Sequence, residues 1–182
     1  MESKNNNSQN RIAKESMFIA LMILMEKKSF KKISITELTK KAGVSRMAFY
    51  RNYTQMEDII SNYLSEFFEE FSNQLSSCEE LNNYESLCLF FSFFRKHERL
   101  IANLISSNLT NILLEKCTKS FHTLSMNIVC TKSCSPEKVI YIIEFVSGGL
   151  YKVLIEWAKN SMKESDAAMA KIMCNFVSNL ID

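Results

Sequence analysis

The amino-acid sequence predicts an all-α protein of about nine helices. Only 3 glycines and 1 proline occur among its 182 residues, which leaves little material for hairpins and tight turns. Apolar side chains recur three and four residues apart along most of the chain, as they do on the buried face of a helix. We therefore expect an N-terminal three-helix domain that contains a helix-turn-helix, followed by a helical-bundle body.

The chain begins with a polar, asparagine-rich segment at residues 1–10, which we expect to be a disordered arm. The first helix is expected at about residues 10–28, because Met17, Leu21 and Leu24 recur at helical spacing. Phe30 and Ile33 follow it and are expected to anchor the connector on the core of the three-helix domain.

The next stretch predicts a helix-turn-helix. Ser34 and Glu37 form an S-x-x-E capping box, so a helix should begin directly after Ser34. Gly43 can adopt a positive φ, which ends that helix and turns the chain. Ser45 is the expected cap of a second short helix that runs to Arg51. Such a unit places its second helix in the major groove of DNA.

The side chains around this second helix suit both kinds of contact made with DNA. Hydroxyls and lysines hold phosphates and position the protein, whereas side chains in the groove read base edges. The phosphate contacts are expected from Ser34, Lys41, Ser45, Tyr50 and Tyr53. The base contacts are expected from Arg46, Met47 and Asn52. Phe49 is expected in the core.

The same residues carry a family resemblance. The stretch SITELTKKAGVS (34–45), followed by FYRNY (49–53) and EDII (57–60), resembles the DNA-binding domain of the TetR/AcrR (tetracycline-repressor) family over about residues 12–60. Ser29 and Met56 depart from the family pattern, which usually has a glycine and a phosphate-contacting lysine there. The resemblance implies a transcriptional regulator that binds a palindromic site in double-stranded DNA as a homodimer.

The resemblance also implies a DNA-binding domain at residues 11–56 and a ligand-binding and dimerisation body at residues 57–182. A T-x-x-E capping box at Thr54 and Glu57 should begin a helix that runs to about residue 76. The aromatic stretch from Tyr84 to Phe94 predicts a helix buried on all sides. A proline after a capping serine begins a later helix. The remaining helices are expected at about residues 97–106, 109–129, 136–162 and 166–180.

Gly148 and Gly149 interrupt the helix expected at residues 136–162, at a cost of about 1 kcal/mol each relative to alanine. The pair indicates a local bend or close approach of another backbone. Residues 145–165 resemble the body of one branch of the TetR family, in which the last two helices pair with those of a second subunit. The alternative is that these side chains fill the subunit's own core. The interface candidates are Tyr151, Leu154, Ile155, Trp157, Met173, Phe176, Val177 and Leu180.

The resemblance further implies a pocket in the body for a small-molecule effector, whose binding shifts the spacing of the two DNA-binding domains. An apolar, aromatic lining would suit a hydrophobic ligand. The same side chains are also what a plain bundle core requires. The pocket candidates are Phe90, Phe94, His97, Phe121, Met126, Tyr141 and Phe145.

Charge and cysteine patterns limit the function classes. Residues 1–60 hold 11 Lys and Arg against 6 Asp and Glu, and residues 61–182 hold 11 against 14, as a basic DNA-binding end on an acidic body would. None of the 6 cysteines lies in a C-x-x-C pair, so neither a metal nor a cofactor is expected. Two alternatives remain for these cysteines: a redox-sensing pair at Cys130 and Cys134, or reduced thiols packed as small apolar side chains.

No stretch reaches the ~18 apolar residues that span a bilayer, and residues 1–10 lack the apolar core of a signal peptide. We therefore expect a cytoplasmic protein without a membrane partner. The family resemblance implies a repressor, and the apolar, aromatic lining expected in the body suits release by a small hydrophobic ligand. The alternative is a regulator, activators included, controlled by a protein partner docked on the C-terminal body. An enzyme is disfavoured, because the sequence has no paired carboxylate motif, no nucleophile beside a base and no phosphate loop.

Overall fold

The computed structural model describes residues 2–77, 82–128 and 136–181, with side chains described at residues 8–77, 82–123 and 138–176. Within these ranges the fold is all-α, as predicted. Its elements are α1 (Glu2–Met25), the 3-10 helix η1 (Phe30–Lys32), α2 (Ile35–Ala42), α3 (Arg46–Asn52), α4 (Glu57–Ser77), α5 (Asn83–Lys96), α6 (Glu98–Ser106), α7 (Thr110–Ile128), α8 (Pro136–Lys159) and α9 (Asp166–Ile181).

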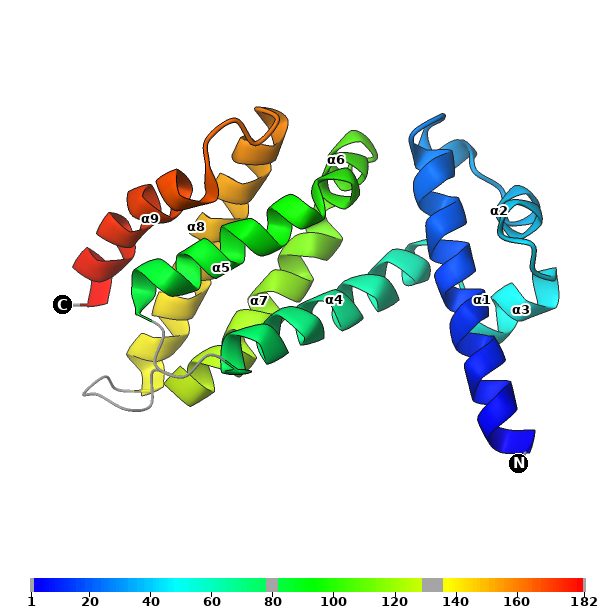
Figure 1. The fold of residues 1–182 in the computed structure, drawn as a ribbon, viewed down its shortest axis with the longest axis horizontal. Coiled ribbons are helices and arrows are strands. Elements are labelled where there is room, and N and C mark those ends of the chain that lie inside the picture. The colour runs from blue at the N-terminus through cyan, green and yellow to red at the C-terminus, as the bar shows by residue number, and fades with distance from the viewer. Residues whose placement is uncertain (1, 78–81, 129–135, 182) are drawn as a thin grey trace.

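The helices form two groups joined by one long helix (Figure 1). We call α1 to α3 the head and α5 to α9 the body. α4 runs from the head into the body, and the two chain termini lie at opposite ends of the molecule. The helix-turn-helix of α2 and α3 lies on the side of α1 that faces away from the body (Figure 1). This arrangement leaves α3 at the outer end of the molecule.

Caps define the two helices of the helix-turn-helix. Ser34 Oγ accepts a hydrogen bond from the Glu37 N–H at 3.2 Å, and Ser45 Oγ accepts one from the Ala48 N–H at 3.1 Å. Gly43 ends α2 in the left-handed region, with φ 68°, so both predicted caps and the turn glycine are confirmed. The Glu37 carboxylate, however, pairs with the Lys28 ammonium, which ties α2 to the segment after α1.

The predicted capping box at the start of α4 is wrong. α4 begins at Glu57, and the carboxylate that reaches back belongs to Asp58. Its Oδ2 accepts hydrogen bonds from the N–H groups of Thr54 at 2.8 Å and Gln55 at 2.9 Å. These backbone bonds lower the pKa of the Asp58 carboxyl, because they stabilise its charged form.

Two other predicted boundaries need correction. α1 begins at Glu2 rather than near residue 10, so the segment expected to be a disordered arm belongs to the helix. The reason is cooperativity, since each residue added to a formed helix gains one hydrogen bond without a new nucleus. α8 ends at Lys159 rather than at residue 162, because Ser161 and Met162 turn the chain with φ values of 57° and 45°.

One apolar core runs through both groups. In the head it contains Leu38 and Phe49, both 0% exposed. In the body it is built from phenylalanine rings, among them Phe67 and Phe93 with centroids 4.6 Å apart. α5 buries five of its side chains but exposes Tyr84, so the prediction of a helix buried on all sides is only partly right. α4 contacts α1 at its start and α5 and α7 further along, so it belongs to both parts of the core.

Candidate nucleic-acid interface

The helix α3 has one buried side and one exposed side. Phe49 is 0% exposed and its ring lies edge-on to Tyr50, with centroids 5.3 Å apart. On the other side Met47 is 73% exposed and Tyr50 is 52% exposed, beside an exposed Arg46. The predicted separation of an inward-packing Phe49 from outward-pointing Arg46, Met47 and Tyr50 is therefore found. A guanidinium, a thioether and a phenol together face away from the core.

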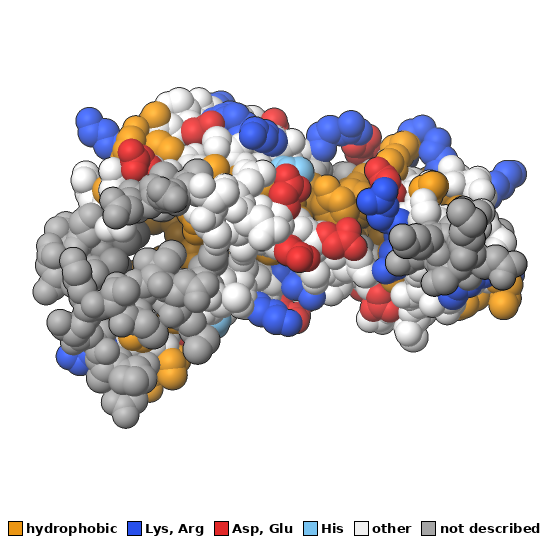
Figure 2. Space-filling view, turned by 60° about the horizontal axis from the view of Figure 1, so that its bottom comes forward, with side chains coloured by type: hydrophobic (Ala, Val, Ile, Leu, Met, Phe, Trp, Pro, Cys, Tyr) orange, Lys and Arg blue, Asp and Glu red, His pale blue; other side chains and the backbone are white. Residues whose placement is uncertain are grey.

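The expected phosphate-binding side chains of the turn lie beside this surface. Ser34, Lys41 and Ser45 are all exposed. The two serine oxygens accept the capping bonds, so each hydroxyl hydrogen remains able to donate to an anion. Figure 2 shows Lys and Arg side chains around the head, at the right of that view, whereas carboxylates gather over the middle of the molecule. The charge division expected from the sequence is thus visible on this face.

Asn52 does not join the exposed groups of α3. Its Nδ2 donates to the Ala48 carbonyl at 2.8 Å and to Asn10 Oδ1 at 2.8 Å. Because both amide hydrogens are used inside the protein, the expected base contact from Asn52 is corrected to a structural role: it holds the end of α3 against α1. Nothing in the sequence around Asn10, where the first helix is predicted to begin, indicates this long-range bond.

Tyr53 is also less exposed than a phosphate contact would require. Only 6% of it is accessible, and its ring lies 5.9 Å from that of Phe49. Burial raises the pKa of the Tyr53 hydroxyl to about 12, and the carboxylates of Glu66 and Asp58 add to the shift. The phenol therefore stays protonated at neutral pH and keeps a hydrogen to donate.

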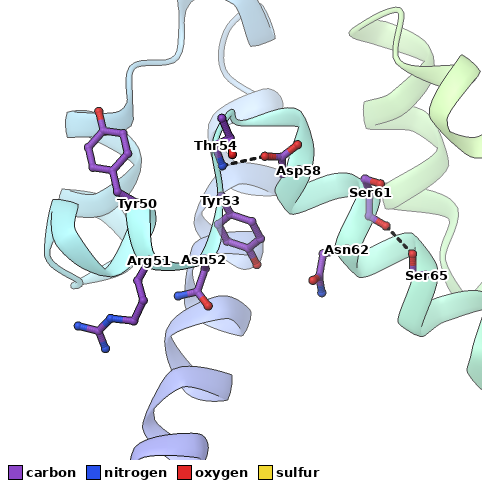
Figure 3. Close-up of a pocket in the computed structure, with 9 residues that line it drawn as sticks. All are labelled: Tyr50, Arg51, Asn52, Tyr53, Thr54, Asp58, Ser61, Asn62 and Ser65. Atoms are coloured by element: carbon purple, nitrogen blue, oxygen red, sulfur yellow. Dashed lines mark hydrogen bonds between the residues drawn. The ribbon is translucent and has the colours of Figure 1, made fainter.

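A polar recess of about 450 Å³ opens between the end of α3 and the start of α4 (Figure 3). Figure 3 shows Arg51 extending outward at one side of it, while Asn62 and Ser65 lie on α4 at the other. The lining is polar, so the recess suits water or an anion better than an apolar ligand. Arg51 is not among the DNA contacts predicted from the sequence, although its position places a cation in the last turn of α3. The recess is lined by Tyr50, Arg51, Asn52, Tyr53, Thr54, Asp58, Ser61, Asn62 and Ser65.

Polar and aromatic contacts join the head to the body. Asn103 Nδ2 of α6 donates to the Met22 carbonyl of α1 at 3.2 Å. Arg99 of α6 pairs with Glu26, at the end of α1, with Nη2 2.6 Å from Oε1. The rings of Phe18 and Tyr63 stack between α1 and α4 with centroids 3.5 Å apart. The orientation of the head is thus fixed by α6 as well as by α4.

The effector-pocket candidates separate into two sets. Phe90 and Phe94 are buried with ring centroids 4.7 Å apart, Phe121 lies 6.3 Å from Phe90, and half-buried His97 lies 4.8 Å from Phe67. These four belong to one aromatic cluster. Tyr141 and Phe145 do not, because they are 75% and 65% exposed on α8. Their assignment to a pocket is wrong, and the side chain of Met126 lies outside the described residues.

The dimer candidates separate in the same way. Leu154, Ile155 and Trp157 are at most 6% exposed and pack inside the subunit, so the alternative of a core role is correct for them. Trp157 lies 5.3 Å from the Phe91 ring and donates its indole N–H to the Glu164 carbonyl at 3.2 Å. Tyr151 and Met173 are half-buried, and Phe176 is 64% exposed. The side chains of Val177 and Leu180 lie outside the described residues.

An exposed apolar surface lies on α8 and α9, and of its side chains only Phe176 is predicted from the sequence to lie at an interface. On α8 it contains Ile140, Tyr141 and Phe145, and on α9 it contains Ile172 and Phe176, each between 49% and 75% exposed. A Cβ built on Gly148 or Gly149 would meet no atom of the chain within 4 Å, so neither glycine is required by packing within the subunit. The i, i+4 spacing of Tyr141 and Phe145 was a usable signal, but periodicity does not say which face of a helix is buried.

The family follows from the C-terminal half of the chain. Residues 81–179 match the family model TetR_C_8, described as a transcriptional regulator C-terminal region. The chain belongs to the TetR family of transcriptional regulators. Proteins of this family are not enzymes. No curated protein sequence matches the chain, and among the described residues no helix has the length and apolar content needed to cross a membrane.

Several solved structures share the fold along nearly the whole chain. Lin0861 from Listeria innocua is 17% identical with a TM-score of 0.79, over 94% of this chain and 92% of that one. The dihydroxyacetone kinase operon activator DhaS is 14% identical with a TM-score of 0.65, over 93% and 96%. FadR from Bacillus subtilis in complex with stearoyl-CoA is 15% identical with a TM-score of 0.60, over 90% and 96%. At these identities the likeness concerns the fold alone.

Proposed function

We propose that this TetR-family regulator is a dimeric, DNA-binding repressor that a small hydrophobic ligand releases from a palindromic operator. The DNA-binding part of the proposal rests on helix α3, which has one buried side and one exposed side. Buried Phe49 fixes the orientation of the helix, so Arg46, Met47 and Tyr50 stand exposed together. A rigidly held cationic and apolar surface at the outer end of the molecule is what a major groove accepts.

Each exposed group has a role in this proposal. Arg46 donates two parallel hydrogen bonds to a guanine, and Met47 contacts a thymine methyl. Ser34, Lys41, Ser45 and Tyr50 donate to phosphates and fix the position of the helix in the groove. The DNA-binding domain is then residues 11–56, with residues 57–182 as the regulatory body. A regulator of this kind works in the cytoplasm, where its operator is.

The dimer in this proposal forms through the exposed surface of α8 and α9. Tyr141, Phe145 and Phe176 are each at least 64% exposed, and aromatic side chains gathered on a surface indicate an interface. The open space over Gly148 and Gly149 lets a second backbone come close. A two-fold dimer would present two α3 helices to half-sites about 34–36 Å apart.

The effector in this proposal binds at the aromatic cluster of the body. Its rings come from α4 as well as from α5, as the contact of Phe67 and Phe94 shows, with ring centroids 5.3 Å apart. A ligand that separated these rings would move α4, which leads directly into the head. It must bind the DNA-incompetent arrangement more tightly than the other, because only differential affinity shifts such an equilibrium. The stearoyl-CoA bound to the similar FadR structure supports a ligand with an apolar chain.

A second candidate function is activation through a protein partner docked on the body. One similar structure is that of an operon activator, DhaS. The two candidates differ in the sign of the response, so a reporter gene placed behind the operator separates them. Repression predicts higher expression when the protein is deleted, whereas activation predicts lower expression.

Selection of sheared genomic DNA on the purified protein at near-physiological salt tests the DNA-binding part. We expect enrichment of one or a few palindromic sites, and loss of that enrichment in Arg46→Ala. Lys119→Ala is the matched control, because it removes the same charge from an exposed position on α7. Equal enrichment by both variants, or no enriched sequence with the wild-type chain under any ligand condition, would contradict the proposal.

A further inference from the structure

α5 and α9 pack side by side along their length, with the chain running in opposite directions (Figure 1). One end of this pair is fixed by Arg95 of α5. Its Nε lies 2.6 Å from Asp166 Oδ1, at the start of α9, and its Nη1 donates to the Met162 carbonyl at 2.9 Å. The guanidinium also lies 4.7 Å from the centroid of the Trp157 ring. These contacts set Arg95 and Asp166 at the same level of the two helices.

This register brings two cysteines to one level. Cys88 precedes Arg95 by 7 residues, and Cys174 follows Asp166 by 8 residues. At a rise of about 1.5 Å per residue, the two positions lie about 10.5 Å and about 12 Å from the ion pair, in the same direction. Seven residues are close to two helical turns, so Cys88 returns to the face of α5 that carries Arg95, whereas eight residues place Cys174 about 80° around α9 from Asp166, one turn after the buried Ala170.

The surroundings of the two thiols agree with this placement. Both are half-buried and pack against the core. Ala170, one turn before Cys174, is 0% exposed and has a side chain small enough to let the helices approach closely. A hydrogen bond with Cys88 raises the pKa of the Tyr84 hydroxyl, and the charge of Cys174 adds to the shift. Both cysteines therefore influence the same hydroxyl group.

We propose that Cys88 and Cys174 are a thiol oxidation site that closes to a reversible disulfide between α5 and α9 of one subunit. Neither residue belongs to the DNA-binding surface or to the exposed apolar surface, so the inference stands apart from the proposed function. Disulfide formation requires Cα atoms about 4.4–6.8 Å apart, a separation reached by facing residues of closely packed helices.

The oxidant in this proposal is a hydroperoxide, ROOH. One thiolate attacks it, so that an S–O bond forms, the O–O bond breaks and ROH leaves. The second thiolate attacks the resulting sulfenic sulfur, which forms the S–S bond, breaks the S–O bond and releases water. Two thiols are oxidised and one hydroperoxide is reduced. A thiol reductant reverses the reaction by exchange.

Cys117 provides an internal comparison within the same fold. It is 1% exposed on α7, and burial raises the pKa of its thiol to about 12. Such a thiol is neither accessible nor ionised at neutral pH, so it should stay reduced under the same treatment. A difference between it and the proposed pair would show selectivity rather than general oxidation.

The test is peptide mapping of the full chain after treatment with one equivalent of hydrogen peroxide and alkylation of the remaining thiols. We expect a linked peptide that contains Cys88 and Cys174, a mass about 2 Da lower for the loss of two hydrogens, and recovery of both thiols with reductant. On a non-reducing gel the chain should still migrate as a monomer. Cys117→Ser should keep the linked peptide.

The single variants Cys88→Ser and Cys174→Ser remove one sulfur while keeping a small side chain. Each should lose the linked peptide and leave a sulfenic acid on the remaining cysteine, trapped as a dimedone adduct. Three outcomes would each overturn the proposal. They are full alkylation of both cysteines after peroxide, a link from either one to Cys78, Cys130 or Cys134, and a link between subunits.

Discussion

The head and the body of this regulator differ in the range of the contacts that determine their structure. In the head, Ser34, Gly43 and Ser45 each act on their own helix end, and all three positions do in the structure what their residue types predict. In the body, the decisive contacts join residues far apart in sequence, such as Arg95 with Asp166. Local sequence features therefore predict the helix-turn-helix well, whereas long-range packing decides which face of each body helix is buried.

α4 makes the two regions depend on each other, and the largest predicted effect tests this. Phe94→Ala in the body and Phe49→Ala in the head each remove a fully buried ring. Each should lower the free energy of unfolding by about 3–5 kcal/mol. Because α4 supplies side chains to both parts of the core, denaturant unfolding followed by circular dichroism and by hydrogen exchange in α3 should show one shared transition for both variants.

Met47→Ala is the matched control for Phe49→Ala, since it shortens a side chain of the same helix that is 73% exposed. Its effect on stability should stay within about 0.5 kcal/mol. If Phe94→Ala unfolded in two separate transitions, with the stability of the head unchanged, the head and the body would be independent folding units.

The exposed surface of α8 and α9 gives the next largest effect. Phe145→Asp places a charge where the proposed dimer buries an aromatic ring, and loss of a central aromatic contact costs about 2 kcal/mol or more. We expect at least a ~30-fold weaker dimer by analytical ultracentrifugation, with helical content unchanged. The matched control is Glu144→Gln, an exposed neighbour that pairs with His122 across α7 and α8. An unchanged dimer in Phe145→Asp would remove this surface from the interface.

The junction between the regions gives a smaller effect. Asn103→Ala removes the donor that α6 supplies to the Met22 carbonyl, which still accepts from the Glu26 N–H at 3.3 Å, so the cost should be that of one ordinary hydrogen bond, about 1 kcal/mol. Since that bond fixes the head on the body, operator affinity should fall more than stability does. The ratio of operator affinities with and without ligand is the informative readout. Arg99→Ala breaks an ion pair whose arginine is 79% exposed, so it should change both quantities less.

The sequence predicts the features that depend on local contacts and fails at those that depend on long-range contacts. The helix-turn-helix and the exposure of Met47 and Tyr50 were predictable, because caps, a turn glycine and a short amphipathic helix are local features. Asn52 was misassigned because its partner Asn10 lies 42 residues away. Tyr141 and Phe145 were misassigned because α8 carries apolar residues on more than one face. Only the packing of α6 and α7 against it decides which face is covered.

His97 offers the smallest and most specific test, because it ends α5, begins α6 and lies in the aromatic cluster. Burial among Phe67 and Phe93 lowers the pKa of His97, Lys96 adds to the lowering, and the Glu70 carboxylate opposes it. The unfolded chain therefore takes up this proton at a higher pH than the folded one, and stability rises with pH where that difference exists. Relative to wild type, His97→Phe should lose less stability as the pH falls below about 6.5. Denaturant midpoints at pH 7.5 and 5.5 measure this, with His122→Phe as the matched control. If the two variants showed the same pH dependence, burial of His97 in the aromatic cluster would not be the cause.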